Sequence, residues 1–230
     1  MVSGFAHAPL TKAVIALTTA AALALATLDA KAYDRFQFAP HILTHHQYWQ
    51  AFTYHLAFPS SDRHVLAVVL LYYAGIPVER RLGSRRYAAL LLTTALLHSA
   101  LSLAWGALLS LVTPPAALRG GFLPGGPFGV LTALAATYFA VVPPLWTVRI
   151  DALELTDRIV VGIPIALLAG AQLPTSGISA ALGCAAAYVY HTRLHSLEVP
   201  ENIATRFCAL RPLVGSLQLP ARSSDAEYPA

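Results

Sequence analysis

Serine and histidine side chains are the first candidates for chemistry in this sequence, because a serine hydroxyl beside a histidine base can act as a nucleophile. One such pair, His98 and Ser102, is spaced i,i+4 inside a long apolar run, so a helix would place both on one face. Polar side chains within apolar helices usually face the bundle interior and bond to a neighbouring helix. We favour that structural interpretation over a catalytic dyad.

Histidines also crowd the stretch 31–64, which contains five of them together with Trp49 and several other aromatic residues. His41 and His45 have an i,i+4 spacing that could hold a metal ion, but no cysteine or carboxylate cluster accompanies them. Trp and Tyr side chains prefer the headgroup level of a bilayer. The pattern therefore predicts an interfacial, half-embedded loop over 31–61, with no metal and no cofactor.

The elements that would position these residues are membrane helices, because 57% of the 230 residues are hydrophobic and only 11% are charged. A soluble domain carries about 25% charged residues. The composition, with a mean hydropathy of +0.59, excludes a soluble enzyme, a disordered tail and a nucleic-acid-binding protein. The two cysteines, Cys184 and Cys208, offer no disulfide or zinc framework.

Charge-free runs predict an all-α, polytopic membrane protein with six spans in residues 1–192, followed by a polar cytosolic tail over 193–230. Proline pairs and a turn near 173–177 divide the longer runs. Several spans are shorter than a straight crossing, which implies a locally thin bilayer or completion by interfacial residues. The expected spans are 13–30, 62–78, 87–111, 126–142, 158–173 and 177–191.

Lysine and arginine residues indicate which side of the membrane each loop faces. With a cytosolic N-terminus, eleven of the 15 lie on the cytosolic side and four on the far side, and the loop 80–86 decides the difference. Both termini are therefore expected in the cytosol. A signal peptide cleaved near Ala30-Lys31-Ala32 is the alternative for the first segment. We prefer a retained span, because Asp29 and Lys31 crowd the cleavage point.

Residues 75–87 contain a glycine, a glutamate four residues later, then a Gly-Ser and a basic pair, at Gly75, Glu79, Gly83-Ser84 and Arg85-Arg86. This pattern resembles the signature with which the second span of rhomboid-family proteins leaves the membrane. Upstream, Trp49 resembles the tryptophan of their first-loop motif. The resemblance covers roughly 13–191 and implies a six-span, rhomboid-like helical bundle.

Glu79 is the one acidic residue of this signature, and it lies beside Arg80 and Arg81 at a helix end. At such a place a carboxylate can reach the headgroups or pair locally. No second carboxylate lies at a matching depth to share acid–base work. We therefore interpret Glu79 as a solvated or paired structural anchor and not as a catalytic carboxylate.

An active rhomboid needs a serine nucleophile on its fourth span, a histidine base on its sixth, and hydrogen-bond donors from its second. Phe128-Gly129 and Gly183 set the register of the fourth and sixth spans. A slip of one residue would recover His64 as a donor, but the single asparagine of the chain, Asn202, lies in the tail. The resemblance therefore implies a pseudoprotease whose nucleophile, base and donor positions are degenerate: Pro124, Ala180, Arg63 and Ala67.

Small residues remain where the catalytic groups are missing. Ser179, Gly183 and Ala187 form a row at i,i+4 spacing on the sixth span, and Gly129 begins a comparable surface on the fourth. Such rows let helix backbones approach closely. We favour packing of the bundle as their role over a groove that binds clients.

Two further strings, at 3–12 and 45–58, make the resemblance more specific. They resemble the rhomboid-like pseudoprotease subunits of fungal Dsc membrane ubiquitin ligases and their animal counterparts, which carry a ubiquitin-associated domain. The tail 193–230 is too short and polar for that domain, so we expect it to be absent. The resemblance implies a non-catalytic scaffold or client adaptor in the endoplasmic reticulum or Golgi membrane, acting in quality control or in processing of a sterol-responsive transcription factor.

The partners implied are membrane lipid, other membrane subunits of a ubiquitin ligase and transmembrane client proteins, with no nucleic acid. Two other functions stay open at this point. A derlin-like retrotranslocation or lipid-perturbing factor would copurify with an unfoldase. An active intramembrane serine protease, the less favoured of the two, would be labelled by a fluorophosphonate.

Overall fold

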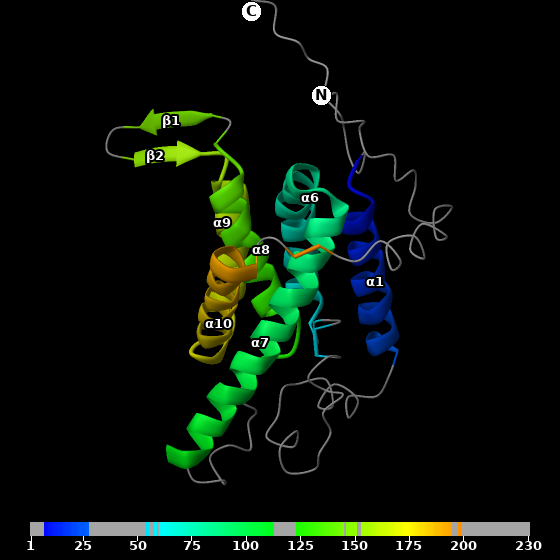
Figure 1. The fold of residues 1–230 in the computed structure, drawn as a ribbon, viewed down its shortest axis with the longest axis vertical. Helices are drawn as coiled ribbons and strands as arrows, with labels where there is room; N and C mark the ends of the chain where they lie inside the picture. Colours follow the sequence, from blue (N-terminus) through cyan, green and yellow to red (C-terminus); the bar gives the residue numbers. More distant parts are fainter. Residues whose placement is uncertain are drawn as a thin grey trace, which may run out of the picture.

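The computed structural model describes residues 7–27, 54–55, 58, 60–112, 123–144, 146–150, 153–194 and 197–198. These residues are mostly helical and form one bundle (Figure 1). The helices are α1 (Pro9–Ala26), α5 (Ser61–Leu70), the π-helical turn η1 (Leu71–Gly75), α6 (Ile76–Leu82), α7 (Ser84–Val112), α8 (Phe128–Val141), α9 (Ile159–Gly170), α10 (Thr175–Val189) and the π-helical turn η3 (Tyr190–Leu194).

Each expected span overlaps a helix, with α5, η1 and α6 together occupying the second. Among the described residues, one helix is long and apolar enough to cross a membrane on its own, Ser84–Leu109. Three others are apolar but shorter: Pro9–Ala24, Phe128–Val141 and Ile159–Gly170. Six membrane crossings therefore stay a prediction. Trp49, the loop 31–61, the segment around Ala30-Lys31-Ala32 and most of the tail lie outside the described residues.

The purely helical prediction is wrong at one place, because strands β1 (Thr147–Ile150) and β2 (Leu153–Thr156) form an antiparallel hairpin between α8 and α9. Pro143-Pro144 ends α8, since proline cannot continue its hydrogen-bonding pattern. The following residues alternate between polar and apolar, and this period of two favours strands. Each strand has only four residues, and over so few residues the pattern of polar and apolar side chains does not distinguish a strand from a loop.

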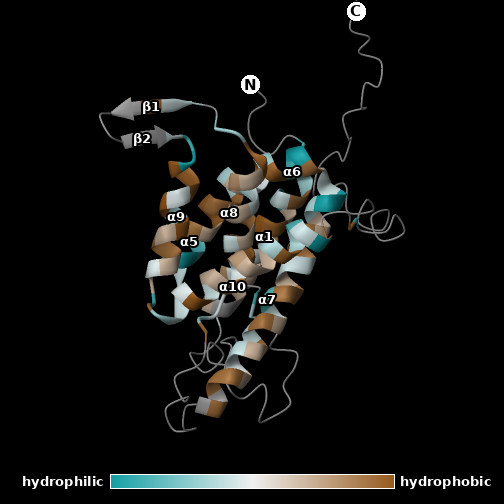
Figure 2. Cartoon of the chain, turned by 60° about the vertical axis from the view of Figure 1, so that its left-hand side comes forward, coloured by the Kyte–Doolittle hydropathy of each residue, from teal (hydrophilic) through white to brown (hydrophobic). Residues whose placement is uncertain are grey.

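Helix α8 forms the centre of the bundle, where it packs against α10, α7, α9 and α6. Apolar and small residues occupy all sides of α8, which is typical of a fully buried helix. Phe128, Leu131 and Leu134 of α8 pack with Leu70 and Leu90 in the main core cluster. Figure 2 shows hydrophobic residues along the helices and a group of hydrophilic residues near α6.

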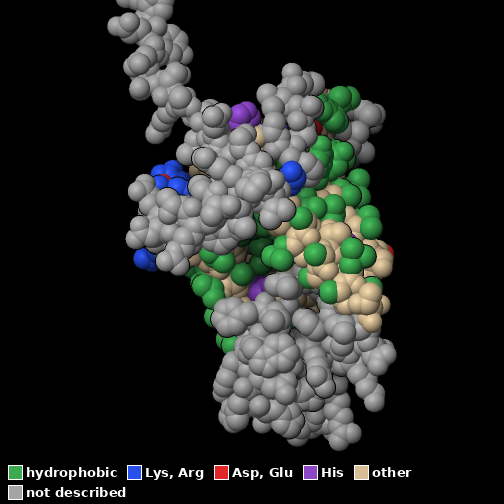
Figure 3. All heavy atoms as spheres, turned by 90° about the vertical axis from the view of Figure 1, so that its right-hand side faces the viewer, with side chains coloured by type: hydrophobic (Ala, Val, Ile, Leu, Met, Phe, Trp, Pro, Cys, Tyr) green, Lys and Arg blue, Asp and Glu red, His purple; other side chains and the backbone are tan. Residues whose placement is uncertain are grey.

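The α5–η1–α6 segment runs as one continuous helical stretch and α7 returns in the opposite direction, so helix ends gather at two levels (Figure 1). One level holds the start of α1, the junction between α6 and α7, and the β1–β2 hairpin; we call it the hairpin end. Figure 3 shows hydrophobic side chains across the middle of one described face, with Lys and Arg side chains toward this end. The distribution matches a protein whose apolar belt meets lipid.

The junction between α6 and α7 is a single residue, Gly83, with φ of 81° and ψ of 152°. Residues other than glycine rarely adopt this backbone conformation. The Gly83 amide also donates a hydrogen bond of 2.8 Å to the Glu79 carbonyl oxygen, which closes the last turn of α6. The glycine thus allows α6 to end and α7 to begin within one residue.

Candidate functional site

The four degenerate positions lie on three elements, and none carries a nucleophile or a base. Pro124 is buried in the segment that precedes α8, and Ala180 is half-buried on α10. Arg63 and Ala67 lie one turn apart on α5, with Ala67 buried. The pseudoprotease register itself stays a prediction. The arrangement nevertheless supplies no serine, histidine or asparagine at those four positions.

The fourth- and sixth-span glycines do come together, as the small-residue rows predict. An ideal Cβ built on Gly183 of α10 would lie 2.5 Å from the Gly129 carbonyl oxygen of α8 and 2.8 Å from its Cα. A Cβ on Gly129 would in turn overlap the imidazole ring of His98 on α7. The two glycines therefore let three helices meet at one point, which is the role expected of small residues in membrane bundles.

His98 is fully buried at this meeting point and has partners from two other segments. Its Nδ1 atom is joined to the Tyr54 hydroxyl by a hydrogen bond of 2.6 Å. Its Nε2 atom lies 3.2 Å from Ser179 Oγ on α10. The interhelical hydrogen bond favoured for His98 is thus present, although its serine partner is Ser179 and not Ser102, the residue one turn away on the same helix.

A second contact joins the segment 54–55 to α7, because His55 Nε2 lies 2.9 Å from Ser99 Oγ. Burial raises the pKa of the Tyr54 hydroxyl and lowers the pKa of His55 to about 3, with His98 as a further cause for His55. Tyr54 and His55 are therefore both neutral near pH 7. A neutral network suits a low-dielectric interior, where unpaired charge is costly.

The chemistry open to the Ser179–His98 pair is limited by its burial. A hydroxyl at 3.2 Å from an imidazole nitrogen has the distance of an activated nucleophile. However, Ser179 is 1% exposed and His98 is 0% exposed, so a peptide carbonyl has no approach to the Ser179 oxygen. Tyr54 occupies the place that an orienting carboxylate takes in a hydrolytic triad. The network is suited to fixing helices and not to hydrolysis.

Glu79 is buried and hydrogen-bonded within the protein. Of the two roles that its position suggested, a solvated anchor and a paired anchor, the structure therefore has the paired one. Its carboxylate accepts hydrogen bonds from the Leu10 amide at 2.9 Å and from the Thr11 amide and hydroxyl, both at 2.7 Å. The Ser84 hydroxyl donates a further bond of 2.6 Å. Because Leu10 and Thr11 lie in the first turn of α1, the carboxylate satisfies amides that have no partner within the helix.

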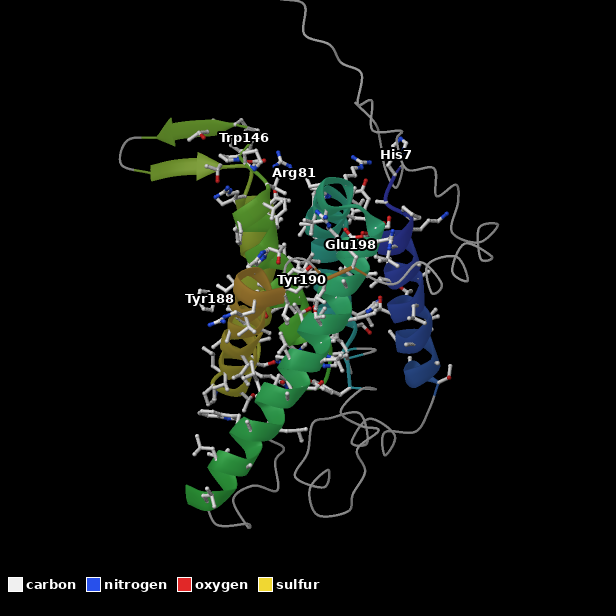
Figure 4. The ribbon with its side chains drawn as sticks, in the orientation of Figure 1. His7, Arg81, Trp146, Tyr188, Tyr190 and Glu198 are labelled. Atoms are coloured by element: carbon white, nitrogen blue, oxygen red, sulfur yellow. The ribbon has the colours of Figure 1, made fainter. Side chains whose placement is uncertain are left out.

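Arginine side chains donate hydrogen bonds to carbonyl oxygens at the end of α8. Figure 4 labels Arg81, together with Trp146 and Glu198. Arg81 donates a hydrogen bond of 2.7 Å to the Val141 carbonyl, and Arg158 donates one of 2.9 Å to that of Val142. Both carbonyls belong to the C-terminal end of α8, whose partial negative charge favours a cation. Glu198 pairs with Arg86 at 2.7 Å across a sequence separation of 112 residues.

No cluster of three or more His, Cys, Asp or Glu that could hold a metal ion occurs among the residues that were placed. His41 and His45 are not among them. Three polar side chains of the described bundle, His98, Glu79 and Arg81, make interhelical or capping hydrogen bonds.

The comparison with protein families agrees with this picture of a membrane-embedded bundle. Residues 11–207 match the family described as eukaryotic integral membrane protein (DUF1751). The chain belongs to this family. The matched range includes α1 from Thr11 onward, the later helices of the described bundle, the β1–β2 hairpin and Glu198. Both glycines of the α8–α10 contact and the capping carboxylate of Glu79 are therefore parts of the DUF1751 region.

A curated relative gives a more specific comparison for this DUF1751 protein. The chain is 26% identical over 185 residues to "DSC E3 ubiquitin ligase complex subunit 2" of Schizosaccharomyces pombe. The aligned region is 80% of this chain and 48% of the relative, so the chain spans about half the length of that protein. No solved structure matches the chain significantly.

Sequence reasoning missed the partners of several residues that it had singled out. The spacing of His98 and Ser102 drew attention to the correct histidine, but Ser179 lies 81 residues away and Tyr54 lies 44 away. Thr11 and Ser84, which bind Glu79, were not selected as site residues. The small-residue row that includes Ser179 was the only sequence signal that pointed to the face of α10 on which His98 rests.

Proposed function

We propose that this protein is a non-catalytic, rhomboid-like membrane subunit of a Dsc-type ubiquitin ligase complex. In that complex it scaffolds other membrane subunits and presents transmembrane clients for ubiquitination. The observation that carries the proposal is the similarity to the fission yeast ligase subunit over 80% of this chain. Membership of an integral membrane family over 11–207 supports the membrane location of that role.

The geometry of the bundle supports a scaffold in preference to a protease. Pro124, Ala180, Arg63 and Ala67 cannot supply a nucleophile, a base or an asparagine donor. Two serine–histidine contacts occur in the described bundle, and in both the serine is buried: Ser179 beside His98 is 1% exposed and Ser99 beside His55 is 7% exposed. Polar groups are used instead to hold α1 and α7 in place, at Glu79 and His98. A rigid arrangement of helices is what a subunit needs to present a constant surface to its partners.

The proposal includes an orientation in the endoplasmic reticulum or Golgi membrane with both termini cytosolic. It rests on the positive-inside excess and on the gathering of Arg81, Arg86 and Arg158 at the hairpin end. Ser60 precedes α5, and Arg81 lies in the last turn of α6, so the two residues are at opposite ends of the continuous α5–η1–α6 stretch. In the proposed orientation Ser60 therefore lies on the lumenal side of the membrane.

This orientation predicts the outcome of glycosylation mapping. An Asn-x-Ser/Thr acceptor inserted near Ser60 should be modified in cells, because that segment would face the lumen. An acceptor near Ser224 should stay unmodified in the cytosol. The measurement is the shift in gel mobility that is removed by an endoglycosidase. Modification near Ser224, or its absence near Ser60 in a folded variant, would contradict the six-span orientation.

Affinity purification in a mild detergent tests the complex directly. The tagged full-length chain should bring down membrane ubiquitin ligase subunits, including one with a ring-finger domain, identified by mass spectrometry. An unrelated multi-pass membrane protein with the same tag is the control for non-specific recovery. Enrichment of an unfoldase without ligase subunits would overturn the proposal in favour of a derlin-like factor.

A further inference from the structure

Three helix ends meet at the buried carboxylate of Glu79: the start of α1, the end of α6 and the start of α7. On each of them, the residue that follows the contact is basic. These residues are Lys12 on α1, Arg80 on α6 and Arg85 on α7, and we call them the basic collar. Lys12 and Arg80 are exposed, and the side chain of Arg85 is 39% exposed. One buried carboxylate thus gathers three cations at the hairpin end.

The basic collar belongs to a part of the bundle with an excess of positive charge. Helices α1, α6 and α7 hold five lysine or arginine residues and one acidic residue, Glu79. Glu79 is buried, and its carboxylate accepts four hydrogen bonds from amides and hydroxyls. A second carboxylate, that of Glu198, pairs with Arg85 at 3.8 Å and with Arg86 at 2.7 Å. In this described part of the chain, two carboxylates therefore accompany five cations.

Exposed apolar side chains follow the cations along the same side of α1 and of α7. Leu23 comes eleven residues after Lys12, and Leu92 and Leu96 come seven and eleven residues after Arg85. These spacings are close to two and three turns of a helix, so each leucine lies on the side of its helix that carries the cation. Leu23, Leu92 and Leu96 are 65%, 60% and 52% exposed. We call these two rows the apolar stripes of α1 and α7.

The order of charge and apolar surface along these helices matches one kind of ligand. Both helices begin at the hairpin end, so each cation lies at that end and each stripe runs away from it. Figure 3 shows Lys and Arg side chains toward the hairpin end of a face whose middle is hydrophobic. An anionic phospholipid has the same order, with a charged phosphate above its acyl chains. Basic residues beside a membrane helix attract such lipids.

Two other ligand classes match only half of this surface. An acidic soluble peptide would complement the charge of the collar and leave the apolar stripes uncovered. A zwitterionic lipid would cover the stripes, but its headgroup has no net negative charge to complement the collar. Membership of an integral membrane family places lipid around the bundle in any case. Charge and apolar surface together therefore select an anionic lipid.

We propose that the basic collar and the apolar stripes of α1 and α7 form a binding surface for anionic phospholipids of the membrane leaflet at the hairpin end. The lipid phosphates contact Lys12, Arg80 and Arg85, and the acyl chains lie along the two stripes. Arginine suits this role because its planar guanidinium can donate two parallel hydrogen bonds to one phosphate. The inference depends on membrane integration and is independent of the ligase complex.

Native mass spectrometry of the full-length chain in detergent measures the lipid preference directly. Dioleoyl phosphatidylglycerol and dioleoyl phosphatidylcholine have the same acyl chains and a phosphate each, but only the first has a net negative charge. The native chain should bind the first phosphatidylglycerol at least about tenfold more tightly, because each cation at an anionic surface contributes about fivefold. Equal affinity for the two lipids would overturn the proposal.

Neutralising the collar should remove most of this preference. The collar variant is Lys12→Gln/Arg80→Gln/Arg85→Gln, and its affinity for phosphatidylcholine should stay that of the native chain, because the apolar stripes are unchanged. Lys12→Gln alone changes one exposed side chain, so it tests the proposal even if the triple variant does not fold. This single change should weaken phosphatidylglycerol binding about fivefold. Native affinity in Lys12→Gln and in a folded triple variant would overturn the collar as the binding surface.

The matched control removes three cations from the C-terminal tail instead, in Arg206→Gln/Arg211→Gln/Arg222→Gln. It lowers the net charge of the chain by the same amount as the collar variant does. The control should keep the native preference for phosphatidylglycerol, because the collar is intact. An equal loss of preference in the two triple variants would show that net charge attracts the lipid, and would overturn a binding surface at the meeting point of α1, α6 and α7.

Discussion

Gly183→Ala should lower the free energy of unfolding by about 2 kcal/mol or more, even though alanine is the better helix former. Helix propensity alone favours alanine over glycine by about 1 kcal/mol. At Gly183 the added Cβ would stand 2.5 Å from the Gly129 carbonyl oxygen, and this backbone atom cannot rotate away. Helices α8 and α10 would have to separate, which would also disturb the His98–Ser179 hydrogen bond.

The matched control for this change is Gly162→Ala on α9, where an added Cβ meets no atom within 4 Å. That substitution should be neutral or stabilising, because only the helix-propensity term acts. Both variants would be compared with the native chain in detergent, by thermal unfolding followed through fluorescence-detected size-exclusion chromatography. Equal stability of the two variants would contradict the close α8–α10 contact.

Glu79→Ala should destabilise the bundle by about 4 kcal/mol, because it removes four hydrogen bonds to a buried carboxylate. The side chain is 1% exposed, so water does not replace the lost acceptor for the Thr11 amide and hydroxyl. The first turn of α1 would lose its cap, and the Ser84 hydroxyl its partner. Helix α1 should therefore detach first.

Glu198→Ala is the control, because Glu198 is also an acidic residue of the hairpin end but forms an exposed ion pair with Arg86. Exposed pairs contribute less than about 1 kcal/mol. Limited proteolysis of α1 in detergent measures the difference, since a detached first helix exposes new sites. If α1 were equally protected in the two variants, Glu79 would not be the anchor of the first helix.

The contact behind the Gly183→Ala prediction could be expected from the sequence, whereas the contacts behind the Glu79→Ala prediction could not. The apolar runs predicted the helices, and the i,i+4 row of small residues around Gly183 predicted a close approach of helix backbones, because helical periodicity is a local signal. Glu79 was recognised as an anchor through its place beside Arg80 and Arg81. Its actual partners on α1 could not be predicted, since Thr11 lies 68 residues away in the chain.

Two features of the structure have no strong local signal. The β1–β2 hairpin arises from eight strand residues between proline and aspartate, a length at which strand and loop patterns overlap. The Tyr54–His98–Ser179 network depends on how α7 and α10 pack around Gly129. Spacing on one helix pointed to Ser102 as the partner of His98. Only the arrangement of three segments brings Ser179 to that position.

The proposed lack of proteolytic activity rests on several positions at once. In a serine protease the nucleophile and the base act as a unit, and losing either removes most of the rate. In the predicted rhomboid register, Pro124 and Ala180 occupy both positions, and Ala67 occupies a donor position. Restoring one group should therefore restore no activity. The double variant Pro124→Ser with Ala180→His should also stay inactive, because the donor is still missing.

Cleavage of a rhomboid reporter substrate by the purified protein in bicelles tests the scaffold assignment most directly. The native chain and the Pro124→Ser/Ala180→His variant should both leave the substrate intact, at the rate of a buffer blank. An active rhomboid protease run in parallel shows that the reporter can be cut. Turnover by the native chain above the blank, abolished by a serine-directed inhibitor and by Ser179→Ala, would contradict a non-catalytic bundle.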